Sequence, residues 1–367
     1  MPKRIVFTSF HGRGYRGNTK VIFEQLIKQN KLQPVWLSTN SKIINHIRRT
    51  YGEKHAFKIH SIQGLICLGE TAAILFTHGT SDFPFMYLPR SSMRIQTYHG
   101  LPTKKGEFLR PLSDKKPGVI HRLILNYRFK PISYFLSSSP IVTRIYSSRF
   151  GLPQNRFLET GYPAYDELIQ HENPVNRSNP FISELPQHDF LILYAPTFRK
   201  KEKTRWFPFE DLNLVEIAQF LDTNNAVLAF RAHPNEKLEI DEYRKISPRF
   251  VDASQEKIEN INTLINCTDV IITDYSSIYI EGLLKDIPPL FIPYDIDTYE
   301  RGLPLPYEEV TPGPKIYTQS QLLASLQDTF KQPGKRSAER IRVRDLFFSK
   351  VDGHSTNRVI QFLEETI

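Results

Sequence analysis

The sequence predicts an α/β protein built from two doubly wound parallel sheets, and three observations support this. Apolar, β-branched runs alternate with segments of helical period along most of the 367 residues, as in parallel sheets covered by helices. A stretch rich in Pro, Asn, Ser and Glu, residues 171–188, separates one such series from a second. Each half is long enough for its own sheet. Two facing sheets would place their strand-end loops on a shared cleft, where ligands of open α/β sheets bind.

The first half predicts alternating strands and helices from its start. A strand over residues 4–9 is followed by a Gly-rich turn and a helix over about residues 19–30, for which Asn18 is the expected N-cap. Further strands are expected at residues 33–38, 72–77, 94–98 and 134–138. Helices are expected between them, at residues 41–51, 61–68 and 140–150.

The second half repeats the pattern. Strands are expected at residues 190–194, 226–231, 270–273 and 290–292. Helices are expected near residues 212–221 and 258–267, and from Ser276 onward. A polar helical tract, residues 337–367, is expected to pack back across both domains. The predicted boundaries of the two domains and the final helix are residues 1–165, 166–345 and 346–367.

Composition narrows the class of protein. An apolar fraction of 40% with 24% charged residues indicates a globular chain. The net charge of +9 predicts an anionic partner, which is nucleic acid, a phosphorylated metabolite or an anionic membrane surface. Cys67 and Cys267 lie in apolar segments without metal-ligand spacing, so we expect buried thiols in a reducing compartment. No apolar run suits a signal peptide or a membrane span, and we expect a protein that is soluble or lies on a membrane.

The segment from Thr273 to Ile278 reads Thr-Asp-Tyr-Ser-Ser-Ile and follows a β-branched run. The hydroxyls and backbone N–H groups of Ser276 and Ser277 would lie on the first turn of a helix, where an anion is favoured. An ordinary Asp/Ser helix cap is the alternative and, for this motif alone, the commoner outcome. Glu281 is either a surface residue or a carboxylate that reaches a ribose hydroxyl.

Three other strand ends carry polar side chains. His99 follows residues 94–98 in a His-Gly-Leu-Pro turn and is either a general base or a histidine satisfied by local backbone. Arg231 and His233 point to the same side of an extended run and suit a diphosphate, although a surface Arg and a structural His-Pro turn are the alternative. Thr197 and Arg199 are possible phosphate or acceptor contacts.

Two further patterns are less specific. Basic and apolar residues are mixed over residues 104–130, which suits either an interfacial helix on anionic lipid or a solvated face over a core stripe. Asp295 and Asp297 form a D-x-D pattern that binds divalent metal in some transferases but often occurs by chance.

Taken together, these stretches resemble the CDP-glycerol glycerophosphotransferase family, which primes and polymerises teichoic acids. Each stretch alone is weak evidence for this family, but the ordered set covers most of the chain and is specific to it. The matching stretches are residues 17–20 (GNTK), 99–105 (HGLPTKK), 161–166 (GYPAYD), 194–199 (YAPTFR), 231–234 (RAHP), 273–277 (TDYSS) and 311–314 (TPGP).

The resemblance implies a GT-B fold, with the donor in the C-terminal half and the acceptor approaching from the N-terminal half. It implies that His99 deprotonates an acceptor hydroxyl, which attacks the β-phosphorus of CDP-glycerol while CMP leaves, without a cofactor or a required metal. His233 is implied as the second catalytic residue, at the donor diphosphate. The implied donor-binding residues are Arg231, Thr273, Asp274, Ser276, Ser277, Glu281, Thr197 and Arg199. The implied acceptor-binding residues are Gly100, Lys104, Lys105 and Asn18.

Departures from the family pattern keep donor and acceptor identity open. Ala164 stands where Arg is common, Glu281 where Asp is usual, and residues 101–103 read Leu-Pro-Thr instead of Thr-Pro-Leu. CDP-ribitol is therefore an alternative donor, and a related transferase of CMP-sialic acid or a nucleotide sugar is an alternative enzyme. A nucleic-acid-binding protein is disfavoured because no recognisable module is present. From the chain length we expect a primase-like enzyme that adds one or a few units to a lipid-linked primer, on the cytoplasmic face of the membrane.

Overall fold

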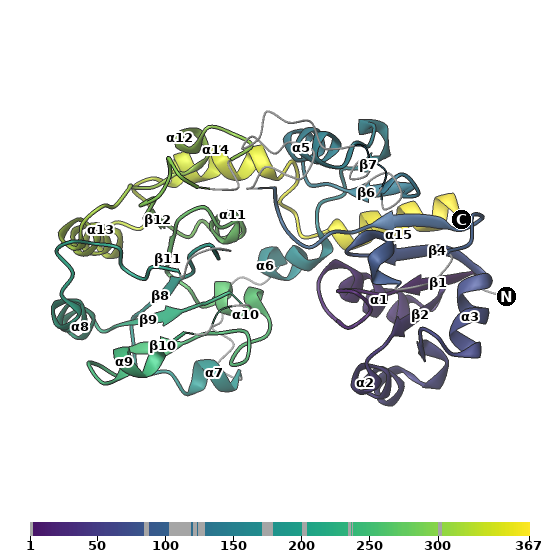
Figure 1. The fold of residues 1–367 in the computed structure, drawn as a ribbon, viewed down its shortest axis with the longest axis horizontal. Coiled ribbons are helices and arrows are strands. Elements are labelled where there is room, and N and C mark those ends of the chain that lie inside the picture. Colours follow the sequence, from purple (N-terminus) through teal and green to yellow (C-terminus); the bar gives the residue numbers. More distant parts are fainter. Residues whose placement is uncertain are drawn as a thin grey trace. The chain divides into compact units, whose positions relative to one another are not determined.

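The computed structural model describes residues 3–83, 88–102, 119, 123, 129–170, 179–199, 204–233, 236, 238–299 and 303–367. The chain divides into two compact units, each a parallel sheet covered by helices (Figure 1). Unit 1 comprises Met1–Asp166 and Phe348–Ile367, and unit 2 comprises Glu167–Phe347. The predicted α/β class is therefore confirmed.

The sheet of unit 1 has the strand order β3-β2-β1-β4-β5-β6-β7, and every described pair is parallel. Its strands are β1 (Arg4–Phe7), β2 (Gln33–Ser38), β3 (Ala56–Lys58), β4 (Thr71–Phe76), β5 (Met93–Gln96), β6 (Tyr134–Leu136) and β7 (Phe157–Leu158). The chain runs from β1 outward to β3 and then crosses to β4 on the other side of β1. The loops after β1 and β4 therefore diverge at a topological switch point, where ligands of such sheets bind.

The helices of unit 1 are α1 (Asn18–Gln29), α2 (Ser41–Tyr51), α3 (Ile62–Gly69), α5 (Pro140–Phe150) and α15 (Ser355–Thr366). Helix α1 buries an apolar stripe against the sheet, because Phe23 meets Trp36 of β2 edge-on at 5.4 Å and Phe7 of β1 at 5.6 Å. The expected N-cap Asn18 is wrong. Gly17 is the N-cap, and the Asn18 side chain bonds to other loops, so it does not cap its own helix.

The sheet of unit 2 has the order β10-β9-β8-β11-β12, again parallel throughout the described pairs. Its strands are β8 (Phe190–Tyr194), β9 (Ala226–Phe230), β10 (Phe250–Asp252), β11 (Val270–Thr273) and β12 (Pro289–Phe291). Its helices are α7 (Pro180–Ser183), α8 (Leu214–Thr223), α9 (Ile240–Arg244), α10 (Ile261–Asn266), α11 (Ile278–Gly282), α12 (Tyr307–Val310), α13 (Gln319–Lys331) and α14 (Ser337–Phe347), and α6 (Asp166–Gln170) begins at the boundary between the units. The switch point of this sheet lies between β8 and β11.

Three short edge strands, β3, β7 and β10, were not predicted. They contain only two or three residues, too few to show a period of two along the sequence. Cys67 is buried as expected, whereas Cys267 is only partly buried.

The C-terminal tract forms two helices instead of one. Helix α14 belongs to unit 2, and the chain then returns to unit 1, where α15 packs against α1. The Asp166 carboxylate holds the start of α15 by accepting the backbone N–H groups of Ser355 (2.9 Å) and Thr356 (2.7 Å). Among the helices of the described residues, none is long and apolar enough to cross a membrane.

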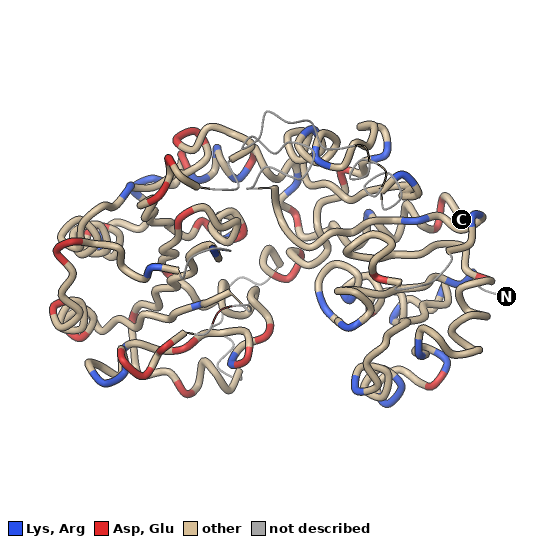
Figure 2. Tube along the Cα trace, viewed as in Figure 1, with Lys and Arg blue, Asp and Glu red and all other residues tan. Residues whose placement is uncertain are grey.

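Charge is divided unevenly between the units (Figure 2). The sequence of unit 1 contains 27 Lys and Arg against 11 Asp and Glu, whereas unit 2 contains 21 against 28. The net charges are therefore +16 and −7. The whole positive excess belongs to unit 1, so an anionic partner is attracted to that unit.

Candidate active site

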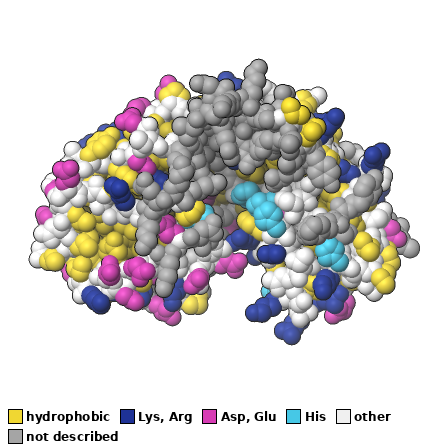
Figure 3. Space-filling view, viewed as in Figure 1, with side chains coloured by type: hydrophobic (Ala, Val, Ile, Leu, Met, Phe, Trp, Pro, Cys, Tyr) yellow, Lys and Arg dark blue, Asp and Glu magenta, His cyan; other side chains and the backbone are white. Residues whose placement is uncertain are grey.

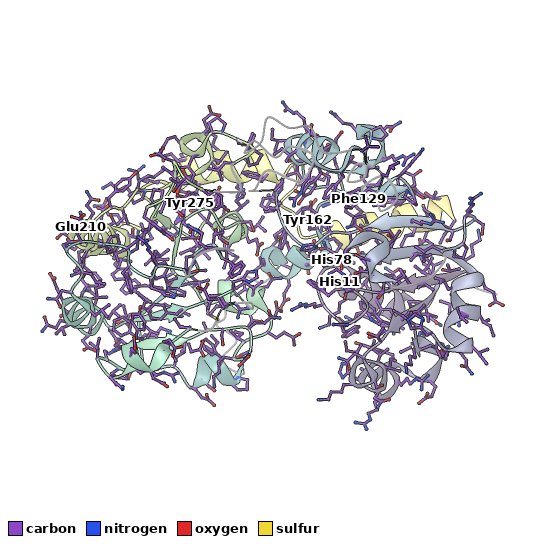
Figure 4. The ribbon with its side chains drawn as sticks, in the orientation of Figure 1. His11, His78, Phe129, Tyr162, Glu210 and Tyr275 are labelled. Atoms are coloured by element: carbon purple, nitrogen blue, oxygen red, sulfur yellow. The ribbon has the colours of Figure 1, made fainter. Side chains whose placement is uncertain are left out.

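Three histidines lie together at the strand ends of unit 1. His11 follows β1, His78 follows β4 and His99 follows β5, and these strands are neighbours in the sheet. The rings of His78 and His99 stack with centroids 4.1 Å apart and planes 7° apart, and His11 lies 4.5 Å from His78 (Figure 4). Histidine side chains reach the molecular surface in Figure 3. Of these three histidines, only His99 was predicted as a site residue, although His78 directly follows a predicted strand and His11 lies two residues after another.

A buried aspartate fixes two of the histidine-bearing loops. Asp82 is 0% exposed and accepts the backbone N–H groups of His11 (2.6 Å), Thr77 (2.6 Å) and His78 (3.0 Å). The Thr77 hydroxyl donates to the same carboxylate at 3.0 Å. Since one group binds the loops after both β1 and β4, Asp82 sets the geometry of the switch point.

The surroundings of His99 disfavour its charged form. Burial first, and then repulsion from His78, lower the pKa of His99 to about 3, against the opposing effects of the Thr77 backbone and Asp82. His99 is nevertheless an exposed residue by its accessible surface, so water reduces the effect of burial, and the repulsion from His78 acts in the same direction. A neutral imidazole near pH 7 is the form that a general base requires.

The amide of Asn18 connects three loops of unit 1. It is 4% exposed; its Nδ2 donates to the carbonyls of Thr97 (2.9 Å) and Tyr98 (3.3 Å), and its Oδ1 accepts the N–H of Ala164 (2.9 Å). Tyr98 has a left-handed backbone with φ of 57°, and the Gly100 carbonyl accepts the hydroxyl of Tyr146. The structure therefore uses Asn18 to hold the His99 loop. Lys104 and Lys105, and almost all of the basic stretch over residues 104–130, lie outside the described residues.

In unit 2, Arg199 is enclosed by acidic and aromatic groups. Its guanidinium donates to both oxygens of Asp295 (2.8 and 2.9 Å) and to Asp274 (2.9 Å). The rings of Tyr275, Tyr294 and Tyr299 lie 5.3–5.4 Å from it. Burial lowers the pKa of Arg199, but the bond to Asp295 and the charge of Asp274 outweigh burial and raise it.

The partners of Arg199 weaken the metal interpretation of the D-x-D pattern, because Asp295 is committed to the guanidinium. Within the described ranges, no group of three or more His, Cys, Asp or Glu side chains is arranged to hold a metal ion.

Asp274 performs in unit 2 the role that Asp82 performs in unit 1. Its carboxylate accepts the N–H groups of Thr197 (2.8 Å), after β8, and Tyr275, after β11. Thr273 donates its hydroxyl to the Ala195 carbonyl at 2.7 Å, which adds a second link between these loops. The Thr197 hydroxyl is buried and finds no hydrogen-bond partner within the part of the chain that is described.

The cap interpretation of the serine run is wrong. Helix α11 begins at Ile278, and Ser277 occupies its N-cap position, but Ser277 has a helical φ of −67° and its side chain makes no capping hydrogen bond within the described residues. Ser276, Ser277 and, on α11, Glu281 are all partly buried.

Arg231 and His233 follow β9, which neighbours β8. One guanidinium nitrogen of Arg231 donates to the carbonyls of Ala253 (2.7 Å) and Ile258 (2.6 Å), which fixes the orientation of this side chain. The exposed His233 ring stacks on Phe198 with centroids 4.8 Å apart. Residues predicted from separate stretches are therefore brought to adjoining strand ends of one sheet.

Known proteins resemble this chain in both sequence and structure. A sequence profile of the family described as CDP-Glycerol:Poly(glycerophosphate) glycerophosphotransferase matches residues 1–365. The teichoic acid glycerol-phosphate transferase of Staphylococcus aureus is 29% identical, and the alignment covers 97% of this chain and 92% of that protein. The teichoic acid ribitol-phosphate polymerase TarL of the same organism is 27% identical, and the alignment covers 98% of this chain and 62% of that protein.

The solved structure of the wall teichoic acid polymerase TagF has a TM-score of 0.78 and 24% identity, and the match covers 100% of this chain and 89% of that one. This likeness confirms the GT-B fold class.

Proposed function

Because the chain belongs to the CDP-glycerol:poly(glycerophosphate) glycerophosphotransferase family, we propose that it transfers glycerol phosphate from CDP-glycerol to a hydroxyl of a lipid-linked teichoic-acid primer or chain, releasing CMP. The observation that carries the proposal is the His99 imidazole, kept neutral at the strand ends of the strongly basic unit 1. An acceptor that contains phosphodiesters is attracted to such a unit.

His99 acts as the general base in this proposal. In the neutral His99 imidazole, one ring nitrogen carries a proton. The other ring nitrogen then carries a lone pair. It accepts the proton of the acceptor hydroxyl as the oxygen attacks the β-phosphorus, and CMP leaves with the bonding electrons.

Unit 2 binds the donor through the loops after β8, β9 and β11. Arg231 and His233 offset the phosphate charge, and the Thr197, Ser276 and Ser277 hydroxyls are hydrogen-bond donors for phosphate oxygens. Thr273, Asp274 and Arg199 hold these loops in register, and in this proposal Glu281 bonds a ribose hydroxyl. Cationic side chains supply the electrostatic stabilisation, so we expect transfer to persist in the presence of EDTA.

The first test offers the protein a lipid-linked disaccharide with CDP-glycerol, CDP-ribitol or CMP-sialic acid, and measures CMP release and product mass. CMP release from CDP-glycerol with addition of glycerol phosphate is expected. The absence of CMP release from either CDP-polyol would refute the proposal. The number of units added is read from the product mass.

The division of roles is tested by two histidine variants. His99→Ala should abolish transfer while leaving the CDP-glycerol dissociation constant unchanged in calorimetry. His233→Ala should abolish transfer and weaken CDP-glycerol binding. His60→Gln, at an exposed histidine outside both sites, is the matched control. Equal donor affinities of the two alanine variants would contradict the assignment.

We also propose that the protein lies on the cytoplasmic face of the membrane. The positive excess of unit 1 and the basic stretch over residues 104–130 support this. Replacing Lys104, Lys105, Lys115 and Lys116 with Glu should release the protein from vesicles that contain anionic lipid. Retained binding would assign the contact to another surface.

A further inference from the structure

The hydrogen bonds around Thr77 fix the position of a proton on His78. The Thr77 hydroxyl lies 3.0 Å from the Asp82 carboxylate, 2.9 Å from the Phe10 N–H and 2.7 Å from His78 Nδ1. A hydroxyl has one proton to donate, and the ionised carboxylate can only accept it. The hydroxyl must therefore accept from both nitrogens, so His78 carries a proton on Nδ1.

This chain of bonds joins His78 to a buried negative charge. His78 Nδ1 also lies 3.7 Å from the nearer Asp82 oxygen, whose side chain has no exposed surface. The arrangement, in which an aspartate orients an imidazole, is one that hydrolases use to fix a tautomer and to stabilise the charged ring. Here a threonine hydroxyl stands between the two groups.

The oriented ring lies directly on the proposed base. His78 and His99 are parallel, with planes 7° apart and centroids at 4.1 Å, and Phe10 packs near both rings at 5.1 and 5.8 Å. Two imidazolium ions at this distance would repel each other strongly. Once one ring of the pair carries a charge, a second proton is therefore disfavoured.

We propose that His78 is a positioning residue for His99: anchored by Thr77 and Asp82, it fixes the plane of the His99 ring and takes the single proton of the stacked pair, which keeps His99 available as the base. The proposal rests on the proposed function for the role of His99, but the coupling of the two rings does not depend on it. Among the described residues, the other charged or titratable groups around the His78–His99 pair include His11 after β1, Asp82 after β4, Arg149 on α5 and Tyr98 in the His99 loop.

The discriminating variant is His78→Phe, which keeps a flat ring for stacking but cannot carry a proton. Loss of the repulsion from His78 should raise the pKa of His99. The sign follows directly: His99 then stays protonated up to a higher pH, so the acidic limb of the kcat/KM profile moves to higher pH. The CDP-glycerol dissociation constant should stay unchanged.

His99 is followed directly by NMR of protein labelled at histidine, with its signal assigned from the His99→Gln spectrum. His60→Gln is the control and should leave both the His99 titration and the pH profile unchanged. If His78→Phe does not fold, as judged by circular dichroism, His78→Gln, which can still donate to the Thr77 hydroxyl, replaces it in the same measurements.

The outcomes separate the two proposals. An unchanged His99 titration in the His78 variant overturns the coupling and reduces His78 to a packing role. A shifted titration with an unshifted acidic limb of activity supports the coupling but removes His99 as the base, which refutes the proposed function. A shift of both in the stated direction supports both.

Discussion

Asn18 offers the sharpest test of how the fold positions the candidate base. Its amide makes three hydrogen bonds to backbone groups of Thr97, Tyr98 and Ala164, all inside unit 1. A buried hydrogen bond contributes a net of about 1 kcal/mol, so Asn18→Ala should lower the unfolding free energy of unit 1 by about 3 kcal/mol. Asn18→Asp should lower it at least as much, because a carboxylate oxygen would face two carbonyls in a buried site.

The effect should be local and measurable. Hydrogen exchange followed by mass spectrometry should show faster exchange in peptides that cover residues 94–102, and urea denaturation should give the loss of stability. Since His99 follows Tyr98 directly, kcat should fall while the CDP-glycerol dissociation constant stays unchanged. Asn45→Asp introduces the same charge at an exposed position of α2 and serves as the control. If Asn18→Asp matches that control within about 0.5 kcal/mol, the positioning argument fails.

Three further predictions concern contacts within single units. Asp166→Ala should cost about 1–3 kcal/mol and should speed hydrogen exchange in α15 more than in α14, because α15 loses its carboxylate cap; equal rates in both helices would contradict this. Gly161→Ala should destabilise the same junction, since φ is +81° and a Cβ would lie 2.4 Å from Ser355 Oγ; unchanged urea denaturation would refute it. Arg199→Met leaves two carboxylates without their cation and should cost unit 2 about 3–5 kcal/mol in urea, and a loss below about 1 kcal/mol would show that these charges are screened.

Local sequence patterns were sufficient to predict the central strands and the motif residues that follow them. Strands such as β2, β8 and β11 have the predicted bounds, because buried parallel strands are continuous apolar runs with turn residues on both sides. The same logic placed His99, His233 and Ser276 after strands. It failed for the edge strands β3, β7 and β10, where two or three residues carry no period, and for the start of α11.

Hydrogen bonds and ion pairs between residues that lie far apart in the sequence could not be predicted from local patterns. Nothing near Asn18 indicates that its amide reaches residues 97, 98 and 164 instead of capping its own helix. Likewise, the sequence predicts Arg199 as a phosphate or acceptor contact and does not indicate its ion pairs with Asp274 and Asp295. Such pairings depend on which strands are neighbours in the sheet.

The sequence alone therefore determined the class of fold, the family and the loops that we propose to carry the chemistry, since apolar period and ordered motifs are properties of neighbouring residues. Only the tertiary structure decided that His11, His78 and His99 meet, and that Asp82 joins their loops. The reason is the order of the strands: β1, β4 and β5 are separated along the chain but adjacent in the sheet, so their ends converge on one switch point.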